Sequence, residues 1–172
     1  MKKILIITAD KCDDSEVLYP YYRIIEEGFE PTIASFEKTI VNAKYHFSIA
    51  ADIAVDEIDA SKYDGLILPG GMAPEKLRQN KAVLDAVKAF DADKKPIAAI
   101  CHGQQILISA GVLDGRNATC YPGIKDDVIN SGAIYEDKCV VVCENLVTSR
   151  RPEDLPYFMQ EFLNLIDKNN LK

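Results

Sequence analysis

The amino-acid sequence predicts an α/β fold in which a mostly parallel sheet is covered by helices on both faces, making a three-layer sandwich. Short, continuous apolar runs alternate along the chain with segments whose apolar residues recur at helical spacing. No internal repeat or linker interrupts this alternation, and 172 residues is the size of one domain. We therefore expect residues 1–172 to form a single domain.

The expected strands are apolar runs bounded by polar residues or turns. They cover residues 3–8, 31–36, 64–68, 97–100, 139–143 and 146–149. The expected helices have apolar residues at helical spacing and end at turn residues such as Gly28. They cover residues 15–27, 74–93, 103–110, 124–130 and 152–167. Residues 40–53 alternate in polarity at Tyr45, Phe47 and Ile49, which predicts a β excursion after the second strand.

The order of these elements is typical of flavodoxin-like folds, and it locates the chemistry. Open parallel sheets bind ligands outside the carboxyl ends of their strands. Three segments leave strands at that edge, namely residues 10–16, 69–75 and 101–103. We expect these segments to meet in space.

Composition excludes several classes of partner. A net charge of −7 without a clustered basic stripe argues against nucleic acid and anionic membranes. The N-terminal apolar run is far shorter than a membrane span. The five cysteines form no Cys-x-x-Cys pair, so we expect a reduced, cytoplasmic protein. With His46 and His102 as the only histidines, we expect no metal and no other cofactor.

Cys101 stands at the strand-to-helix turn formed by residues 97–103, where a buried strand runs into a cysteine, a histidine and a glycine. Turns of this kind expose a nucleophile at the top of a sheet. The following helix points backbone N–H groups at the sulfur, which favours the thiolate, and a protonated His102 would act in the same direction. The alternative is that Cys101 packs as a small buried apolar residue.

Glycines and carboxylates surround this turn in the expected fold. Gly71, after the apolar strand, and His102 are the candidate backbone donors of an oxyanion hole, although a Gly-Gly pair is by itself usually only a turn. Glu16 could hydrogen-bond the sulfur, and Glu75 could orient an imidazole. From position alone each of these acids could equally be a carboxylate at the start of a helix.

Two further features limit the possible chemistry. His46 lies in the β excursion, where a structural or interface position is more typical than a catalytic one. A triad-type glutamine amidotransferase places a cysteine at such a turn but also needs a histidine late in the chain. No histidine follows His102, so that function is excluded.

Four motifs together resemble the PfpI-type intracellular proteases of the ThiJ/PfpI superfamily, and the resemblance spans nearly the whole chain. The most specific motifs are the cysteine-histidine-glycine turn and the Tyr-Pro-Gly-Ile-Lys-Asp-Asp run. The motifs are residues 99–103, residues 69–71 with 73–75, residues 109–113 and residues 121–127.

This resemblance implies a homo-oligomer, from dimer to hexamer, in which Cys101 is the nucleophile, His102 its base and Glu75 comes from a neighbouring subunit. It also implies that Glu16 is a buried carboxyl group facing the cysteine. Positions matching Tyr121, Lys44 and Asp13 line or flank the pocket in this family. Two residues depart from the pattern: Gln104 replaces the usual proline at the helix start, and Asp13 replaces a glutamate of close relatives.

Three functions fit the resemblance. The leading hypothesis is an intracellular cysteine peptidase, acting on short peptides. The second is a glyoxalase or deglycase that acts on methylglyoxal-type carbonyls through Cys101, since a thiolate can attack an aldehyde as well as an amide. The third, of another class, is a redox-responsive stress protein or chaperone in which Cys101 is oxidised.

Overall fold

The computed structural model describes residues 1–168 of the chain. Its centre is a seven-stranded sheet with the order β10-β11-β7-β6-β1-β2-β5. The strands are β1 (Lys3–Ile7), β2 (Glu30–Ser35), β5 (Ile53–Ala54), β6 (Gly65–Leu68), β7 (Ile97–Ile100), β10 (Val140–Cys143) and β11 (Leu146–Ser149). All neighbours pair in parallel except the edge strand β10, which is antiparallel to β11.

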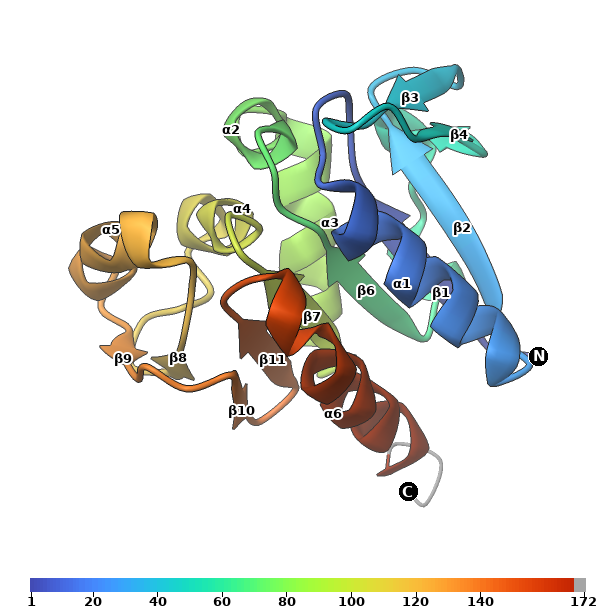
Figure 1. Cartoon of the computed structure of the whole chain (residues 1–172). Helices are drawn as coiled ribbons and strands as arrows, with labels where there is room; N and C mark the ends of the chain where they lie inside the picture. Colours follow the sequence, from blue (N-terminus) through green and yellow to red (C-terminus); the bar gives the residue numbers. More distant parts are fainter. Residues whose placement is uncertain (169–172) are drawn as a thin grey trace.

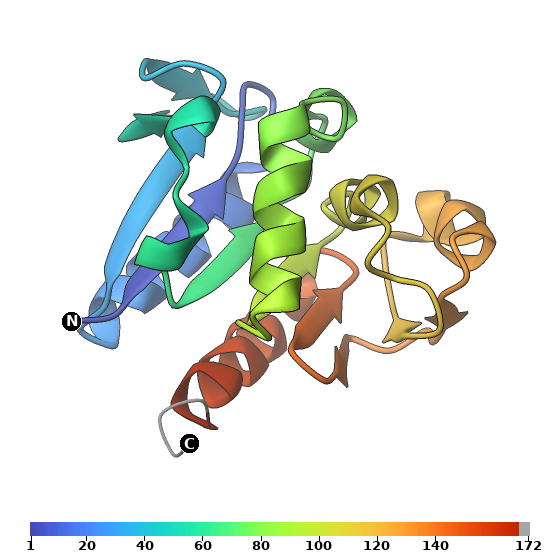
Figure 2. The same ribbon diagram turned by 180° about the vertical axis from the view of Figure 1, so that it is seen from behind.

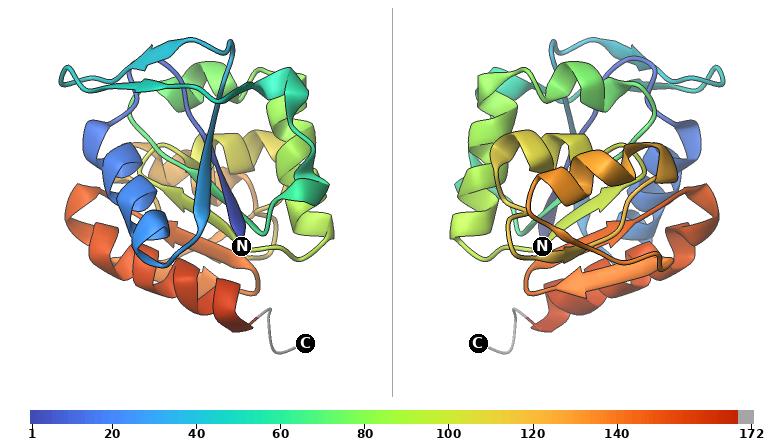
Figure 3. Two further views of the ribbon diagram at one scale, coloured as in Figure 1. Left: turned by 90° about the vertical axis from the view of Figure 1, so that its right-hand side faces the viewer. Right: turned by 90° about the vertical axis from the view of Figure 1, so that its left-hand side faces the viewer.

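Helices cover both faces of this sheet, as predicted. On one face α1 (Asp14–Glu26) packs beside α6 (Leu155–Lys168), and on the other α3 (Lys81–Ala92) packs beside α4 (Gln104–Ala110) (Figures 1 and 2). Seen from the side, the sheet lies between these two helical layers (Figure 3). The flavodoxin-like α/β architecture is therefore confirmed.

The remaining segments are short and lie mostly at the rims. They are the helices α2 (Ala73–Leu77) and α5 (Lys125–Asn130) and the 3-10 turns Val55–Glu57, Ala60–Lys62, Pro122–Ile124 and Pro152–Asp154. None of the helices within residues 1–168 is long and apolar enough to cross a membrane.

The central strands are apolar along their whole length because both of their faces are covered. Every residue of β6 and β7 is buried, and only the first residue of β1 is exposed. Sheets that face solvent on one side alternate in polarity, whereas parallel sheets between two helical layers do not. This is why the strands read as continuous aliphatic runs in the sequence.

The predicted β excursion is a hairpin of β3 (Ile40–Asn42) and β4 (Ser48–Ala50), which stands above β2 in Figure 1. The Asp14 carboxylate fixes its tip by accepting the backbone N–H groups of Tyr45 and Phe47, at 2.8 and 2.9 Å. After β4 the chain returns to the main sheet as β5. A second pair, β8 (Asn117–Ala118) and β9 (Ile134–Tyr135), lies beside α5.

The prediction of one helix over residues 74–93 is wrong. The structure has α2 and α3 instead, and Asn80 separates them in an extended conformation. Its side-chain oxygen accepts the N–H of Val83, which satisfies the first turn of α3. The helices expected at 124–130 and 152–167 each begin with a 3-10 turn at a proline and become α-helical at Lys125 and Leu155.

Phe162 of α6 provides a test of how the helical layer is held on the sheet. The side chain is fully buried, and it lies so close to Gly65 of β6 that a Cβ there would be 2.7 Å from its Cζ atom. We expect Phe162→Ala to lower the free energy of unfolding by about 3–5 kcal/mol, measured by urea denaturation. Tyr157→Ala, at an exposed position of the same helix, is the control and should change it by less than about 0.5 kcal/mol. Equal losses would contradict this account of the packing.

Candidate active site

The three segments expected at the carboxyl edge of the sheet do meet. The N–H of Gly70, after β6, donates to Glu16 Oε2 of α1 at 2.7 Å. Gly71 pairs with Cys12 through an isolated β-bridge. Cys101, after β7, lies against the same glycines, because a Cβ on Gly70 would be 2.8 Å from the Cys101 Cβ. The prediction that the topology brings these segments together is confirmed.

Cys101 occupies a strained turn between β7 and α4. Its φ of 62° lies in the left-handed region, which costs a non-glycine residue about 1–3 kcal/mol. Two backbone hydrogen bonds hold it there: the Cys101 N–H donates to the Ser149 carbonyl at 3.1 Å, and the Cys101 carbonyl accepts the N–H of Tyr121 at 3.2 Å. The residue is 8% exposed. A sharp turn therefore presents the sulfur at the sheet edge, with a small part open to solvent.

Close backbone approach at this site requires glycine at two positions. A Cβ on Gly70 would lie 2.6 Å from Glu16 Oε2 and 2.9 Å from the His102 nitrogen. Gly71 has a φ of +77°, and a Cβ there would lie 2.5 Å from the Asp13 nitrogen. The backbone N–H groups of Gly71 and His102 lie on the side of the Cys101 sulfur, where they lower the pKa of its thiol.

Glu16 is fully buried under the site. Burial raises its pKa to about 8, the nearby Asp13 charge adds to this, and the Gly70 N–H works against it. Within residues 1–168, Glu16 Oε1 has no nitrogen or oxygen partner, and the group that this carboxyl faces is the Cys101 sulfur. Glu16 therefore holds a proton at neutral pH.

The expectation that the turn favours the Cys101 thiolate is wrong for the resting site. Burial, followed by the Glu16 carboxylate, raises the pKa of the Cys101 thiol well above its usual value. The N–H groups of Gly71 and His102 lower that pKa, but by less. The two acidic protons at the site belong to a coupled pair, so protonation of Glu16 removes the charge that most directly opposes the thiolate.

His102 lies beside the sulfur, with Nδ1 3.2 Å from Sγ. Its ring stacks on Tyr121, at 4.7 Å between centroids and 29° between planes. Burial lowers the pKa of His102, Glu75 opposes this, and Lys44 reinforces it. The imidazole is therefore neutral at pH 7 and can accept a proton, whereas the protonated His102 considered from the sequence is not favoured.

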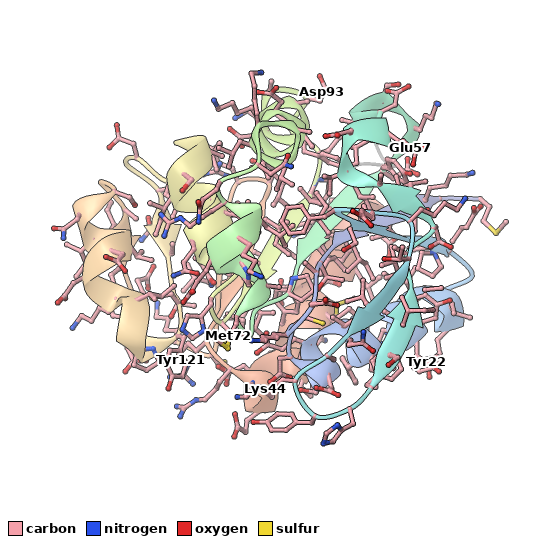
Figure 4. All side chains as sticks on the ribbon, turned by 90° about the horizontal axis from the view of Figure 1, so that it is seen from above. Tyr22, Lys44, Glu57, Met72, Asp93 and Tyr121 are labelled. Atoms are coloured by element: carbon pink, nitrogen blue, oxygen red, sulfur yellow. The ribbon has the colours of Figure 1, made fainter. Side chains whose placement is uncertain are left out.

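The other predicted site residues lie around the rim. Glu75 is exposed on α2, and none of the hydrogen bonds within residues 1–168 joins it to His102, so its charge acts on that ring from a distance. Lys44 and Tyr121 are exposed near Met72 on the face where the strands end (Figure 4). Asp13 is the N-cap of α1, and its Oδ1 accepts the N–H of Ser15 at 3.1 Å.

Sequence reasoning missed the part that Gln104 and Ser149 play beneath the turn. Gln104 is fully buried, and its amide nitrogen contacts main-chain carbonyls of three segments. The available signal was the glutamine itself, a polar residue at the start of an otherwise apolar helix. Nothing in the sequence indicated that the Ser149 carbonyl accepts a hydrogen bond from the Gln104 amide.

One cavity lies far from this site. A cavity of about 460 Å³, bordered by Lys94, Pro96 and Asn145, lies beside residues that precede β7 and β11, at the opposite edge of the sheet. In the described part of the chain, no three His, Cys, Asp or Glu side chains are grouped so that they could hold a metal ion. All five cysteines are free thiols.

Comparison with known families agrees with this geometry. The model of the DJ-1/PfpI family matches residues 2–165. The chain belongs to the DJ-1/PfpI family. This membership confirms the resemblance drawn from the cysteine turn and the Tyr-Pro-Gly-Ile-Lys-Asp-Asp run.

Members of the DJ-1/PfpI family resemble this chain over nearly its full length. Deglycase PfpI of Pyrococcus furiosus is 48% identical over 164 residues, covering 95% of this chain and 99% of that protein. The putative cysteine protease YraA of Bacillus subtilis is 40% identical over 166 residues, covering 96% and 98%. A two-domain Anabaena variabilis protein with DJ-1/ThiJ/PfpI-like and ferritin-like domains aligns with a TM-score of 0.93 and 36% identity, over 95% of this chain and 48% of that one.

The raised pKa of Glu16 predicts a pH dependence of stability. The folded state retains a proton up to about pH 8, whereas an ordinary glutamate releases it near 4.5. The contribution of Glu16 to the free energy of unfolding should therefore be fully present below pH 4.5 and be lost as the pH rises to about 8. The loss is at most about 1.4 kcal/mol per pH unit. We expect Glu16→Gln to remove this slope in urea denaturation series, while Glu26→Gln, exposed on the same helix, retains it. Identical slopes in Glu16→Gln and wild type would contradict the assignment.

Opposite charges at the rim should shift His102 in opposite directions. Glu75 raises and Lys44 lowers the pKa of this imidazole, so Glu75→Gln should lower its titration midpoint and Lys44→Met should raise it. Proton NMR can follow both changes, because the chain has two histidines and His46→Gln identifies their signals. Shifts in the same direction in both variants would rule out this electrostatic account.

Proposed function

We propose that this chain is a deglycase, which removes methylglyoxal-type adducts from amines by nucleophilic attack of Cys101. The observation that carries the proposal is the 48% identity to Deglycase PfpI of Pyrococcus furiosus across almost the whole of both chains. The site supports it, because a neutral imidazole and a protonated carboxyl group both lie beside the Cys101 thiol. We therefore favour the deglycase hypothesis over the peptidase hypothesis.

The reaction begins with transfer of the thiol proton to a nearby base. His102 Nδ1, at 3.2 Å from Sγ, is neutral and can accept it. The sulfur then bonds to the adduct carbon that carries the amine and a hydroxyl group. As that carbon–nitrogen bond breaks, the amine leaves with the proton held by His102, and the product on Cys101 is a hemithioacetal.

The remaining steps need no external oxidant. The proton on the sulfur-bearing carbon moves to the oxygen of the neighbouring ketone, which gives an enediol. The hydroxyl proton of the first carbon then moves to the second carbon, so the first becomes a thioester carbonyl and the second becomes an alcohol. Water then splits the thioester, which releases lactate and restores the thiol. In total, one adduct and one water give one free amine and one lactate.

The surroundings of Cys101 fit the charges that develop in these steps. Negative charge on substrate oxygen can be stabilised by the backbone N–H groups of Gly71 and His102, which already favour negative charge on the sulfur. Glu16 carries a proton at pH 7 and can share it with the sulfur or with the substrate. The carboxyl group and the imidazole thus serve as acid and base within one site.

Peptidase activity is the second candidate, supported by the 40% identity to the putative cysteine protease YraA. Cys101 is only 8% exposed as a residue, which limits the size of the molecules that can reach its thiol. This limited access favours a small carbonyl adduct over a peptide bond held in an extended chain. The limited access argues less strongly against short peptides than against long extended chains.

Assembly into a homo-oligomer would complete the surroundings of His102. In one subunit Glu75 is exposed and reaches His102 through its charge alone, so it does not orient the ring. We propose that a Glu75 carboxylate from a neighbouring copy supplies that hydrogen bond. The exposed apolar side chains of Met72 and Tyr121 at the same rim support contact between copies.

The decisive experiment compares two substrates on the same variants. With methylglyoxal adducts of N-acetyl-lysine, we expect the wild type to release free amine and lactate in equal amounts. Cys101→Ser should lower this rate by more than about 10³-fold, because it removes the nucleophile. Fluorogenic peptide amides, assayed in parallel, should be cleaved far more slowly.

Cys139→Ser is the matched control, since Cys139 is a free cysteine outside the site. It should keep the wild-type rate. Peptide cleavage that depends on Cys101 without lactate release would replace the deglycase proposal with the peptidase one. Lactate release that persists in Cys101→Ser would overturn the role of this cysteine.

A further inference from the structure

We propose that Gln104 is a positioning residue for the nucleophile, which holds the Cys101 turn in its strained conformation. The inference rests on the proposed function insofar as Cys101 is the reacting group. Gln104 is the first residue of α4 and is completely buried, yet it carries a polar side chain. Such a group is costly unless its hydrogen bonds serve the fold or the site.

The Gln104 amide joins three separate segments beneath the turn. Its nitrogen lies 3.2 Å from the carbonyl oxygen of Ala99, 2.8 Å from that of Thr119 and 2.8 Å from that of Ser149. Ala99 belongs to β7, Thr119 follows β8, and Ser149 ends β11. One side chain therefore ties the strand that carries Cys101 to the end of β11 and to the segment that follows β8.

Two of these segments supply the backbone hydrogen bonds of Cys101. The Ser149 carbonyl, which receives the Gln104 amide, also accepts the Cys101 N–H at 3.1 Å. Tyr121, two residues after Thr119, donates its N–H to the Cys101 carbonyl at 3.2 Å. Both bonds that keep Cys101 at a φ of 62° thus depend on segments that Gln104 holds in place.

The strained turn determines where the sulfur stands. If it relaxes towards ordinary φ values, Sγ moves away from the N–H groups of Gly71 and His102 and from Glu16. A displacement of about 1 Å in a reacting atom can cost about 100-fold in rate. The amide of Gln104 thereby acts on the reaction without contacting the substrate.

The test measures the reactivity of the Cys101 thiol itself. Gln104→Met keeps the length of the side chain and removes the amide. We expect the rate constant for alkylation of Cys101 by iodoacetamide, followed by mass spectrometry of its peptide across pH 6–10, to change by roughly 10- to 100-fold with an altered pH profile, because the sulfur leaves both the N–H groups that favour the thiolate and the burial that opposes it. For deglycation, kcat should fall while KM changes little. Gln104→Asn is the milder variant, used if Gln104→Met fails to fold, and it is expected to change both rates in the same directions.

Asn145→Leu is the stability-matched control. Asn145 is also a buried carboxamide bonded to a main-chain carbonyl, that of Lys95 at 2.9 Å, but it lies at the opposite end of β11. It should lower the melting temperature and leave Cys101 alkylation unchanged. Wild-type alkylation rates and pH profiles in folded Gln104→Met or Gln104→Asn would overturn the inference. Alkylation needs no deglycase substrate. If the deglycase proposal failed, the alkylation experiment would therefore still test the role of Gln104.

Discussion

The site depends on one backbone constraint, the left-handed conformation of Cys101 at the end of β7. In that conformation the side chain faces Gly70 and Gly71 of the neighbouring strand end, and Glu16 lies directly beneath. The parallel sheet supplies the constraint, because β6, β7 and β11 end at the same edge and their carbonyl and N–H groups meet there. Strain of about 1–3 kcal/mol is held by this surrounding hydrogen bonding, as expected where geometry serves chemistry.

The same geometry couples the protons of the site. Glu16 and Cys101 are both buried and adjacent, so negative charge on one opposes negative charge on the other. The ionisation of the two groups is therefore coupled. The backbone N–H groups favour charge on the sulfur, and the neutral His102 offers a place for its proton. Under the proposed function, charge forms on the sulfur only when its proton moves to the imidazole.

Much of this could be predicted from the sequence, and the reasons are specific. Continuous apolar strands such as residues 97–100 predicted the covered parallel sheet, and strand direction then placed Cys101, Gly71 and Glu16 at one edge. The break at Asn80 was missed because a polar cap inside a helical pattern is weak in sequence. The prediction that the turn lowers the pKa of the Cys101 thiol was also wrong, because that pKa is raised. Burial and the charge of Glu16 depend on distances that residue order does not contain.

The proposed function can be compared with the surroundings of the sulfur. Tyr121 stacks on His102, which lies beside the sulfur, and the exposed residues Lys44 and Glu75 carry opposite charges that act on the same ring. A small adduct needs only to bring one carbon to the sulfur and one oxygen to the N–H groups. A peptide bond would also require extended backbone on both sides of the turn. Under the proposed function, the low exposure of Cys101, 8%, favours the smaller substrate.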